Sequence, residues 1–185
     1  MSDSYHEVEL RLVISDPQQL HRALEAAGAT VIGQGLVRTA SFDFADGRLQ
    51  DARQTLRLRE DWTGTTLTAK VPLTSQADED AGQAKVREEI NIPLPADTGA
   101  TMRRLLQSIG LRESLAYDKT RTSWRLGQAR IDVDVLADGG ACYAEIEAPA
   151  AEIGATRTTL GLDRAPVETR SYFEIVRQVR AGKGR

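Results

Sequence analysis

Charged and apolar side chains alternate in seven short stretches of this 185-residue chain, and the charged ones carry both signs. In the first stretch, residues 7–12, a β-strand would place Glu7, Glu9 and Arg11 on one face, because successive side chains of a strand point in opposite directions. Two carboxylates at alternate positions lie roughly 7 Å apart along a strand. Carboxylates can hold a divalent cation, and Arg and Lys bind phosphate oxygens. The pattern therefore indicates a site that holds a cation against a polyanion.

Six later stretches repeat this alternation. One such strand would be explained by cross-strand salt bridges on an exposed sheet. Seven strands together, with helices that must cover the opposite apolar face, favour a charged interior. In chain order, the polar faces offer Arg57 and Arg59; Thr68 and Lys70; Arg87, Glu89 and Asn91; Lys119, Arg121, Ser123 and Arg125; Arg130, Asp132 and Asp134; and Tyr143, Glu145 and Glu147.

The elements that must position these side chains are eight strands and four helices. We predict strands over 7–14, 36–44, 55–60, 65–71, 86–92, 117–126, 129–135 and 142–148. Helices are predicted from Asp16-Pro17 to Gly28, from Asp97 to Gly110, and over about 150–161 and 168–181. Residues 74–84 are small, polar and acidic and are predicted to form a loop. Eight strands are enough to close a barrel. The sequence therefore predicts a single α+β domain over 1–185, an eight-stranded antiparallel closed β-barrel with a charged interior and helices outside.

Composition narrows the function classes. The net charge is −3 with 28% charged residues, which predicts no bulk attraction to nucleic acid or to an anionic membrane. No apolar run is long enough for a transmembrane helix, and the polar start does not resemble a signal peptide. Cys142 is the only cysteine, so we expect a cytoplasmic protein without an intrachain disulfide. The sequence leaves open whether the chain forms a homodimer.

The ordered set of motifs resembles the CYTH superfamily, the triphosphate tunnel metalloenzymes, which join class IV (CyaB-like) adenylyl cyclases and thiamine triphosphatases. The family's Glu-x-Glu-x-Lys signature corresponds to residues 7–11, and its C-terminal basic-Ser-Tyr element to residues 170–172. Between them lie Leu-Arg-x-Arg at 56–59, Leu-Thr-x-Lys at 67–70, Lys-x-Arg at 119–121, an Asp-bearing strand at 131–134 and Glu-x-Glu at 145–147. Any one motif is weak, but their order along nearly the whole chain is specific.

The resemblance implies a tunnel that binds a small-molecule triphosphate together with Mg²⁺ or Mn²⁺. Arg11 and Lys70 are then the expected catalytic residues. The expected metal ligands are Glu7, Glu9, Asp132, Asp134, Glu145 and Glu147. The expected triphosphate-binding residues are Arg11, Arg57, Arg59, Lys70, Arg87, Lys119, Arg121 and Arg170.

Two departures from the family pattern bear on activity. Arg11 replaces the signature lysine and keeps the charge, but it cannot readily give up a proton. Asn91 stands where the family has a second acid. We favour hydrolysis of inorganic triphosphate, thiamine triphosphate or a nucleoside triphosphate, because the 5% aromatic content shows no evident stacking platform for a base. The alternatives are cyclisation of ATP to cyclic AMP and pyrophosphate, suggested by the cyclase-like ends of the motif set, and a non-catalytic polyphosphate-binding module.

Overall fold

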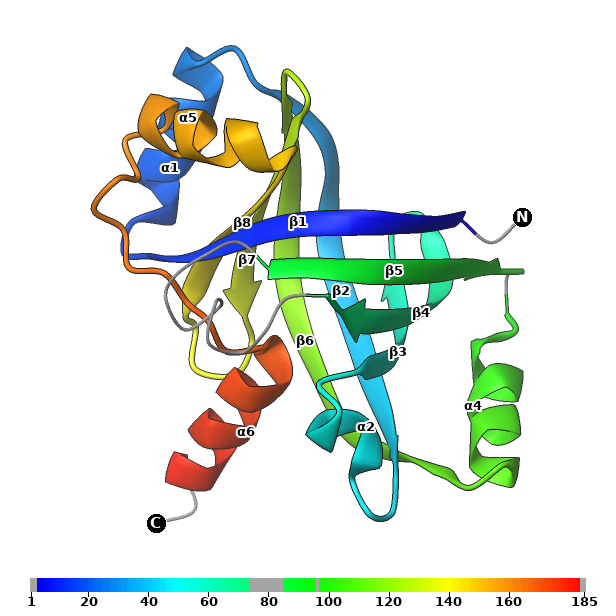
Figure 1. The fold of residues 1–185 in the computed structure, drawn as a ribbon. Coiled ribbons are helices and arrows are strands. Elements are labelled where there is room, and N and C mark those ends of the chain that lie inside the picture. The colour runs from blue at the N-terminus through cyan, green and yellow to red at the C-terminus, as the bar shows by residue number, and fades with distance from the viewer. Residues whose placement is uncertain (1–2, 74–84, 96, 184–185) are drawn as a thin grey trace.

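Eight antiparallel strands close into a barrel (Figure 1). The structure is a computed structural model that describes residues 3–73, 85–95 and 97–183, with side chains from residue 8 to residue 182 outside the two gaps. Around the barrel the strands follow the order β1-β5-β4-β3-β2-β6-β7-β8, and β8 pairs with β1 to close it. The predicted α+β barrel is confirmed. The predicted acidic loop, 74–84, lies outside the described residues.

The strands lie close to their predicted positions, and several are longer than predicted. They are β1 Asp3–Ile14, β2 Thr30–Phe44, β3 Thr55–Asp61, β4 Gly64–Pro72, β5 Lys85–Leu94, β6 Leu111–Leu126, β7 Ala129–Leu136 and β8 Cys142–Glu147. The helices of the described residues are α1 Pro17–Ala26, α2 Arg48–Asp51, α4 Gly99–Ser108, α5 Ala150–Thr159 and α6 Tyr172–Lys183. The four predicted helices are present. Helix α2, a single turn, was not predicted.

The apolar faces of the strands point outwards, and helices cover part of them, while outward-facing Leu36 and Ile92 stay exposed. Helices α1 and α5 lie together over one part of the barrel (Figure 1), and Leu20 and Ile153 from them join the largest hydrophobic cluster, with Leu12 and Ile146 of the strands. Helix α4 contributes Leu106 to a separate cluster against β2 and β3. Because the outer surface is apolar and covered in this way, the charged faces are left to line the interior.

Helix α1 shows why the local sequence signals were reliable. The Asp16 carboxylate accepts a hydrogen bond from the backbone N–H of Gln19 at 2.9 Å, and Pro17 occupies the first helical position. Gly28 follows the helix with a φ of 77°, in the left-handed region that favours glycine.

Strands β2 and β6 extend well before their predicted starts, and they pair with each other from Thr30↔Arg125 to Phe44↔Leu111. A register shift between Val31 and Gly33 interrupts the alternation in β2. Glycine at position 33 admits a close neighbour, because a Cβ there would lie within 3 Å of the Trp62 indole. Because of the bulge and the glycine, side-chain alternation does not predict this part of the strand.

Pro93 does not end β5 as predicted. The strand continues to Leu94, with Pro93 opposite Thr66 of β4. On its other side, the pairing of β5 with β1 ends at Asp3↔Asn91 among the described residues. A residue without a backbone N–H is tolerated where a strand has a neighbour on one side only.

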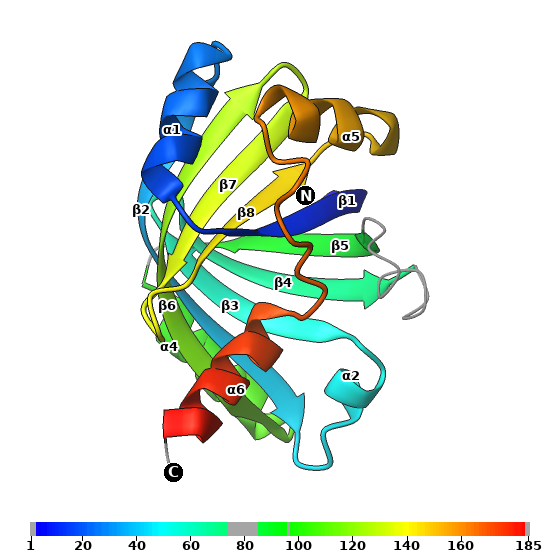
Figure 2. The ribbon, with the colours of Figure 1, turned by 90° about the vertical axis from the view of Figure 1, so that its left-hand side faces the viewer.

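The segment between α5 and α6 crosses the barrel, and α6 follows at its opening (Figure 2). The segment is held to β1, because the Glu168 N–H donates to the Arg11 carbonyl at 2.9 Å and Val167 bridges to Leu12. Helix α6 then buries Tyr172 against inward-facing Tyr117 and Tyr143. The helix therefore packs on the inner side of the barrel, whereas α1, α4 and α5 pack on the outside.

Candidate active site

The interior of the barrel holds a polar cavity of about 210 Å³ lined from every strand. Among the described residues, eight cationic and five acidic side chains line it. The surplus of positive charge suits a polyanion. The cations are Arg11, Arg57, Arg59, Lys70, Arg87, Lys119, Arg121 and Arg130, and the acids are Glu9, Glu89, Asp132, Glu145 and Glu147.

Arg121 of β6 is the centre of a dense ion-pair network on one wall. Its guanidinium donates to Asp132 and Asp134 of β7 and to Glu145 of β8, with 2.6 Å from Nε to Asp134 Oδ1 and 2.5 Å from Nη2 to Glu145 Oε2. Arg130 donates to the other oxygen of Asp132 at 3.0 Å. These buried acids are therefore already compensated by protein cations.

Arg11 of β1 holds the same wall to the C-terminal segment. Its Nε and Nη2 donate to Glu145 Oε1 at 3.0 and 2.5 Å, and its Nη1 donates to the Arg170 carbonyl. The guanidinium carbon lies 4.1 Å from the centre of the Tyr172 ring. Burial alone would raise the pKa of Glu145, but Arg11, Lys119 and Arg121 hold that pKa well below its usual range.

Lys119 and Tyr172 complete this network. The Lys119 ammonium and the Tyr172 hydroxyl both donate to Asp134 Oδ2 at 2.7 Å, and the ammonium lies 4.2 Å from the centre of the Tyr172 ring. Burial and the adjacent Arg121 lower the pKa of Lys119 to about 8, although Asp134 favours its charged form. With Arg121 included, Asp134 accepts from three side chains and is fully buried.

Two carboxylates on neighbouring strands oppose each other at the other end of β8. Glu9 of β1 and Glu147 of β8 are cross-strand partners, so their Cβ atoms lie roughly 5 Å apart. Glu9 is 5% exposed, and its Oε1 has no hydrogen-bond partner among the described residues; cationic groups of Arg87 and Arg11 lie 3.8 and 3.9 Å away. Burial would raise the pKa of Glu9, but Lys70, Arg87 and Arg11 together lower it. Burial raises the pKa of Glu147, which Arg130 only partly offsets. The fold thus brings together two acids that a cation between them would stabilise.

The wall formed by β3, β4 and β5 is predominantly cationic. It carries Arg57, Arg59, Lys70 and Arg87, with Glu89 as the acid that pairs with Lys70 at 2.5 Å. Burial and the nearby Arg57 and Arg121 lower the pKa of Arg59, which reports the local excess of positive charge.

Asn91 has a structural role in this wall. It accepts from Thr68 Oγ1 at 2.7 Å and donates to Glu89 Oε1 at 2.8 Å. An aspartate here could not donate to Glu89. The departure from the family pattern therefore adds a hydrogen bond to Glu89 in place of a further negative charge.

The sequence of this chain matches the family model described as CYTH domain over residues 5–172. The chain belongs to the CYTH domain family. The PH1819 protein from Pyrococcus horikoshii OT3 is similar in fold, with a TM-score of 0.74, 20% identity and coverage of 94% of this chain and 99% of that one. Comparison with curated proteins gives no match.

Two further solved structures resemble this CYTH domain in fold. One is a protein of Vibrio parahaemolyticus provisionally named an adenylate cyclase, with a TM-score of 0.73, 20% identity and coverage of 94% of this chain and 99% of that one. The other is HpAC1 from Hippeastrum, provisionally an adenylyl cyclase and described with a dominant triphosphatase activity; its TM-score is 0.67, its identity 19%, and the coverage 93% and 95%. At these identities the likeness concerns the fold.

The CYTH barrel brings most of the sequence-predicted site residues into one cavity. Glu9, Asp132, Glu145, Glu147 and all the predicted phosphate-binding residues except Arg170 line it. Asp134 is buried behind the lining. The side chain of Glu7 lies outside the described residues. Arg170 lines an adjoining cavity, where it pairs with Glu168 and Gln178.

No three Asp, Glu, His or Cys side chains of the described residues converge as a metal-ligating group. Glu9 and Glu147 would therefore supply two ligands, which suits Mg²⁺, since that ion takes one or two protein carboxylates and completes its shell with phosphate and water. None of the helices in the described part of the chain has the length and apolar character needed to span a membrane.

Sequence reasoning assigned no role to the three aromatic residues that line the cavity, Tyr117, Tyr172 and Phe173. Tyr172 binds Asp134 and stacks with two cations, and Phe173 lines the cavity beside it. The Arg-Ser-Tyr motif at 170–172 pointed to this segment. The motif did not indicate that α6 would pack against the inner face of the barrel.

Proposed function

We propose that this protein cleaves a phosphoanhydride bond of a triphosphate inside the barrel, with Mg²⁺ or Mn²⁺ as cofactor. The observation that carries the proposal is the opposition of Glu9 and Glu147 to a cationic wall across a small enclosed cavity. A polyanion alone would be repelled by the two acids, and a cation alone would be repelled by the wall. A triphosphate with its divalent cation satisfies both sides.

The residues of the two walls would have different roles. Arg57, Arg59 and Arg87 would hold the phosphate oxygens, and their planar guanidinium groups fix orientation as well as charge. Lys70, paired with Glu89, would bind the phosphate nearest β4. When bound between Glu9 and Glu147, the cation would neutralise phosphate charge and orient or acidify a water.

The preformed network around Arg121 would supply rigidity. Arg11, Lys119 and Arg121 are already fixed by acids, so they would offer charge to the substrate without a cost of reorganisation. Such positioning and charge neutralisation are the main requirements of phosphoryl transfer. We also propose that residues 1–185 form one domain, because α6 packs into the barrel formed by the preceding strands.

Cyclisation of a nucleoside triphosphate is the second candidate. It is favoured by Tyr172, the end of the cyclase-like motif, which lies in the cavity and binds Asp134. The two reactions need the same phosphate site. They differ in the nucleophile, which is water for hydrolysis and the ribose 3′-hydroxyl for cyclisation.

The test is to incubate the protein with tripolyphosphate, thiamine triphosphate and ATP, each with Mg²⁺ and with Mn²⁺, and to resolve the products. Release of orthophosphate with either metal, abolished by EDTA, is the expected result. Cyclic AMP with pyrophosphate would favour the second candidate. Binding of triphosphates without any turnover would leave the chain as a polyphosphate-binding module and contradict the proposal.

A further inference from the structure

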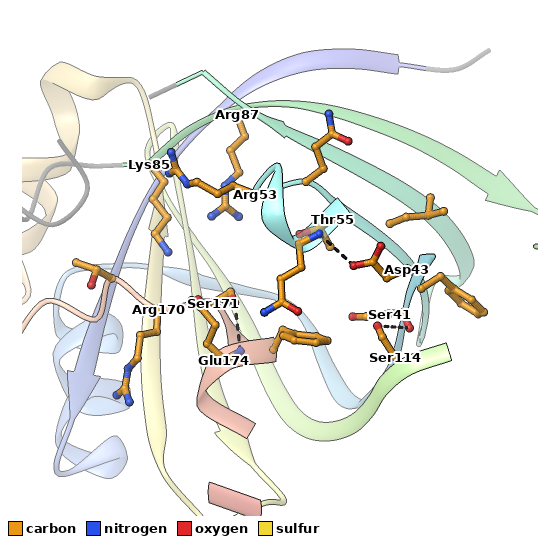
Figure 3. A pocket seen from close by; sticks show the side chains of 16 residues that line it. Ser41, Asp43, Arg53, Thr55, Lys85, Arg87, Ser114, Arg170, Ser171 and Glu174 are labelled. Carbon is orange, nitrogen blue, oxygen red and sulfur yellow. Dashed lines mark hydrogen bonds between the residues drawn. The ribbon is translucent and has the colours of Figure 1, made fainter. Parts of the chain in front are cut away.

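The two ends of the charged cavity differ. Strand β3 runs between them, from Thr55 to Asp61, over roughly 20 Å. At the Thr55 end lies a second cavity of about 300 Å³ beside α6, and five residues line both cavities, so the two are continuous. Arg53, Lys85 and Arg87 gather at one side of the second cavity (Figure 3). A polyanion therefore has a cationic route into the barrel at the α6 end.

Trp62 of the β3–β4 turn lies at the opposite end. A Cβ at Gly33 would lie within 3 Å of its indole, and a Cβ at Gly35 would lie 3.4 Å from its Cε3 atom. The cross-strand partners of these glycines are Ser123 and Arg121 of β6. Arg121 lines the charged cavity, and cross-strand partners point to the same side of a sheet, so the indole covers the inner face of β2.

The indole closes this end of the barrel. Ser123, the next inward-facing residue after Arg121 on β6, is 1% exposed and lines neither cavity, so side chains fill the interior between the charged cavity and Trp62. Trp62 itself is 38% exposed, which places it at the boundary with solvent. The backbone of Gly33 lies outside the left-handed region. Glycine is therefore needed there because the ring approaches closely, and not because of the backbone conformation.

A carboxylate reinforces this closure. Asp61 follows Arg57 and Arg59 at alternate positions of β3, so it shares their inward face. Its side chain is 8% exposed, and it accepts hydrogen bonds from the N–H and the hydroxyl of Thr63 at 2.8 and 2.5 Å. Its Oδ2 atom lies 3.1 Å from Arg59 Nε. Beyond the two arginines, a phosphate chain would therefore meet a negative charge.

The cations of β6 and β7 at this end are engaged within the protein. Arg130 donates to Asp132 at 3.0 Å and to Ser123 at 3.3 Å. Arg125, its cross-strand partner, is exposed and donates to the Gln128 carbonyl of the turn between the two strands. Both side chains are thus held by their own hairpin, and Trp62 and Asp61 are the groups that a phosphate chain would meet at this end.

We propose that the charged cavity is closed at the Trp62 end, so that a phosphate chain enters at the α6 end with one terminus first and is cleaved only close to that terminus. Trp62 is the steric stop, and Asp61 adds an electrostatic one. The inference rests on the proposed function and narrows its substrate class to the ends of phosphate chains. The interior of a long polyphosphate is not a substrate, because the chain cannot pass through the barrel.

The experiment incubates the protein with tripolyphosphate and with a short and a long linear polyphosphate, each with Mg²⁺, and resolves the products by length. The wild type should shorten both polymers from their ends, without fragments of intermediate length. Because each chain has two ends whatever its length, the initial rates at equal concentrations of chains should agree within twofold.

Variants at the closed end test the two stops. Trp62→Ala combined with Asp61→Asn should open this end, while the asparagine keeps an acceptor for Thr63. Fragments of intermediate length should then appear, and the long chain should be cleaved several-fold faster than the short one. Trp62→Phe should keep the wild-type pattern. Leu36→Ala is the matched control, because Leu36 is an exposed apolar residue on the outer face of β2.

Each other outcome has a distinct meaning. Fragments of intermediate length from the wild type, an end-only pattern in the double variant, or cleavage of tripolyphosphate alone would overturn the closed end and leave the proposed function standing. If phosphate chains bind but none is cleaved, the proposed function is wrong and the binding stoichiometry decides the inference. At most two proteins per polymer of either length would support the closed end, and more proteins on the longer polymer would overturn it. Failure of every phosphate chain to bind would overturn both.

Discussion

At the scale of single residues, the two acids of β8 are expected to behave in opposite ways. Glu145 is held by Arg11 and Arg121, whereas Glu147 lies opposite Glu9 with a raised pKa. An acid whose folded pKa is raised destabilises the fold above that pKa, since the folded state disfavours the charge. We predict that Glu147→Gln raises the melting temperature in EDTA at pH 7, while Glu145→Gln lowers it because two buried guanidinium groups lose their partner.

On the proposed function, Glu147→Gln should also reduce triphosphate cleavage at least tenfold, because one of the two protein ligands that we propose for the cation is lost. The measurements are thermal unfolding at pH 7 in EDTA and orthophosphate release with Mg²⁺. A Glu147→Gln protein with full activity would remove Glu147 from the metal site. A melting temperature below that of the wild type would contradict the burial of an incompletely compensated carboxylate at Glu147.

Lys119 gives a prediction about pH. Its pKa of about 8 lies below the ordinary value of 10.5, so it loses its charge in the folded protein as pH rises above about 8. Affinity for tripolyphosphate should then fall by up to tenfold per pH unit, because binding requires the proton. Lys119→Arg stays charged throughout this range and should flatten the profile. Parallel profiles for the two proteins between pH 7 and 9.5 would show that another group is responsible.

Arg11, the residue that replaces the signature lysine, allows a further prediction. It bonds to Glu145 and to the Arg170 carbonyl and stacks on Tyr172, and a lysine could not make all three contacts. We predict that Arg11→Lys lowers the melting temperature and changes kcat/KM for tripolyphosphate by less than tenfold. A tenfold gain, about 1.4 kcal/mol of transition-state stabilisation, would indicate that proton transfer at this position limits the rate.

At the scale of elements, Trp62 of the β3–β4 turn packs against the glycines of β2. A Cβ at position 33 would lie within 3 Å of the rigid Trp62 indole. We predict that Gly33→Ala lowers the free energy of unfolding by about 1–3 kcal/mol through overpacking, and that adding Trp62→Leu restores most of the loss. Gly154→Ala in α5 is the control, because nothing lies within 4 Å and alanine should stabilise the helix. Chemical denaturation measures all three proteins, and equal effects of the two glycine substitutions would contradict this account.

The elements also show how far sequence reasoning reached. Alternation in residues 7–12 or 129–135 assigns each side chain to a face, and this was sufficient to predict a barrel with a charged interior. It cannot assign partners, because pairing depends on the register between strands that are far apart in sequence. The opposition of Glu9 to Glu147 and the enclosure of Asp134 by Lys119, Arg121 and Tyr172 therefore emerged only from the structure.

The packing of α6 against the inner face of the barrel at its opening could not be predicted from the sequence either. The periodicity of residues 168–181 predicts a helix with an apolar face, which the structure has at Tyr172–Lys183, and the other helices of similar pattern cover the outside. The position of α6 is set by a cluster in which Tyr172, Ile175 and Val176 of the helix join Tyr117, Leu136 and Tyr143 of the strands. Phe173, which lines the charged cavity and the adjoining one, could not be assigned to either from the sequence for the same reason.

At the scale of the whole molecule, stability and ligand binding should be coupled, because the cavity is formed by all eight strands and exists only when the barrel is closed. A ligand that binds only the folded state at a hundred times its Kd adds about 2.7 kcal/mol, and a domain of this size gains roughly 2–4 °C per kcal/mol. We predict that tripolyphosphate with Mg²⁺ raises the melting temperature by about 5–10 °C, measured by differential scanning calorimetry. Orthophosphate with Mg²⁺ is the control and should shift it far less, because it engages only part of the cationic wall. Equal shifts with the two anions would contradict a site built for three linked phosphates.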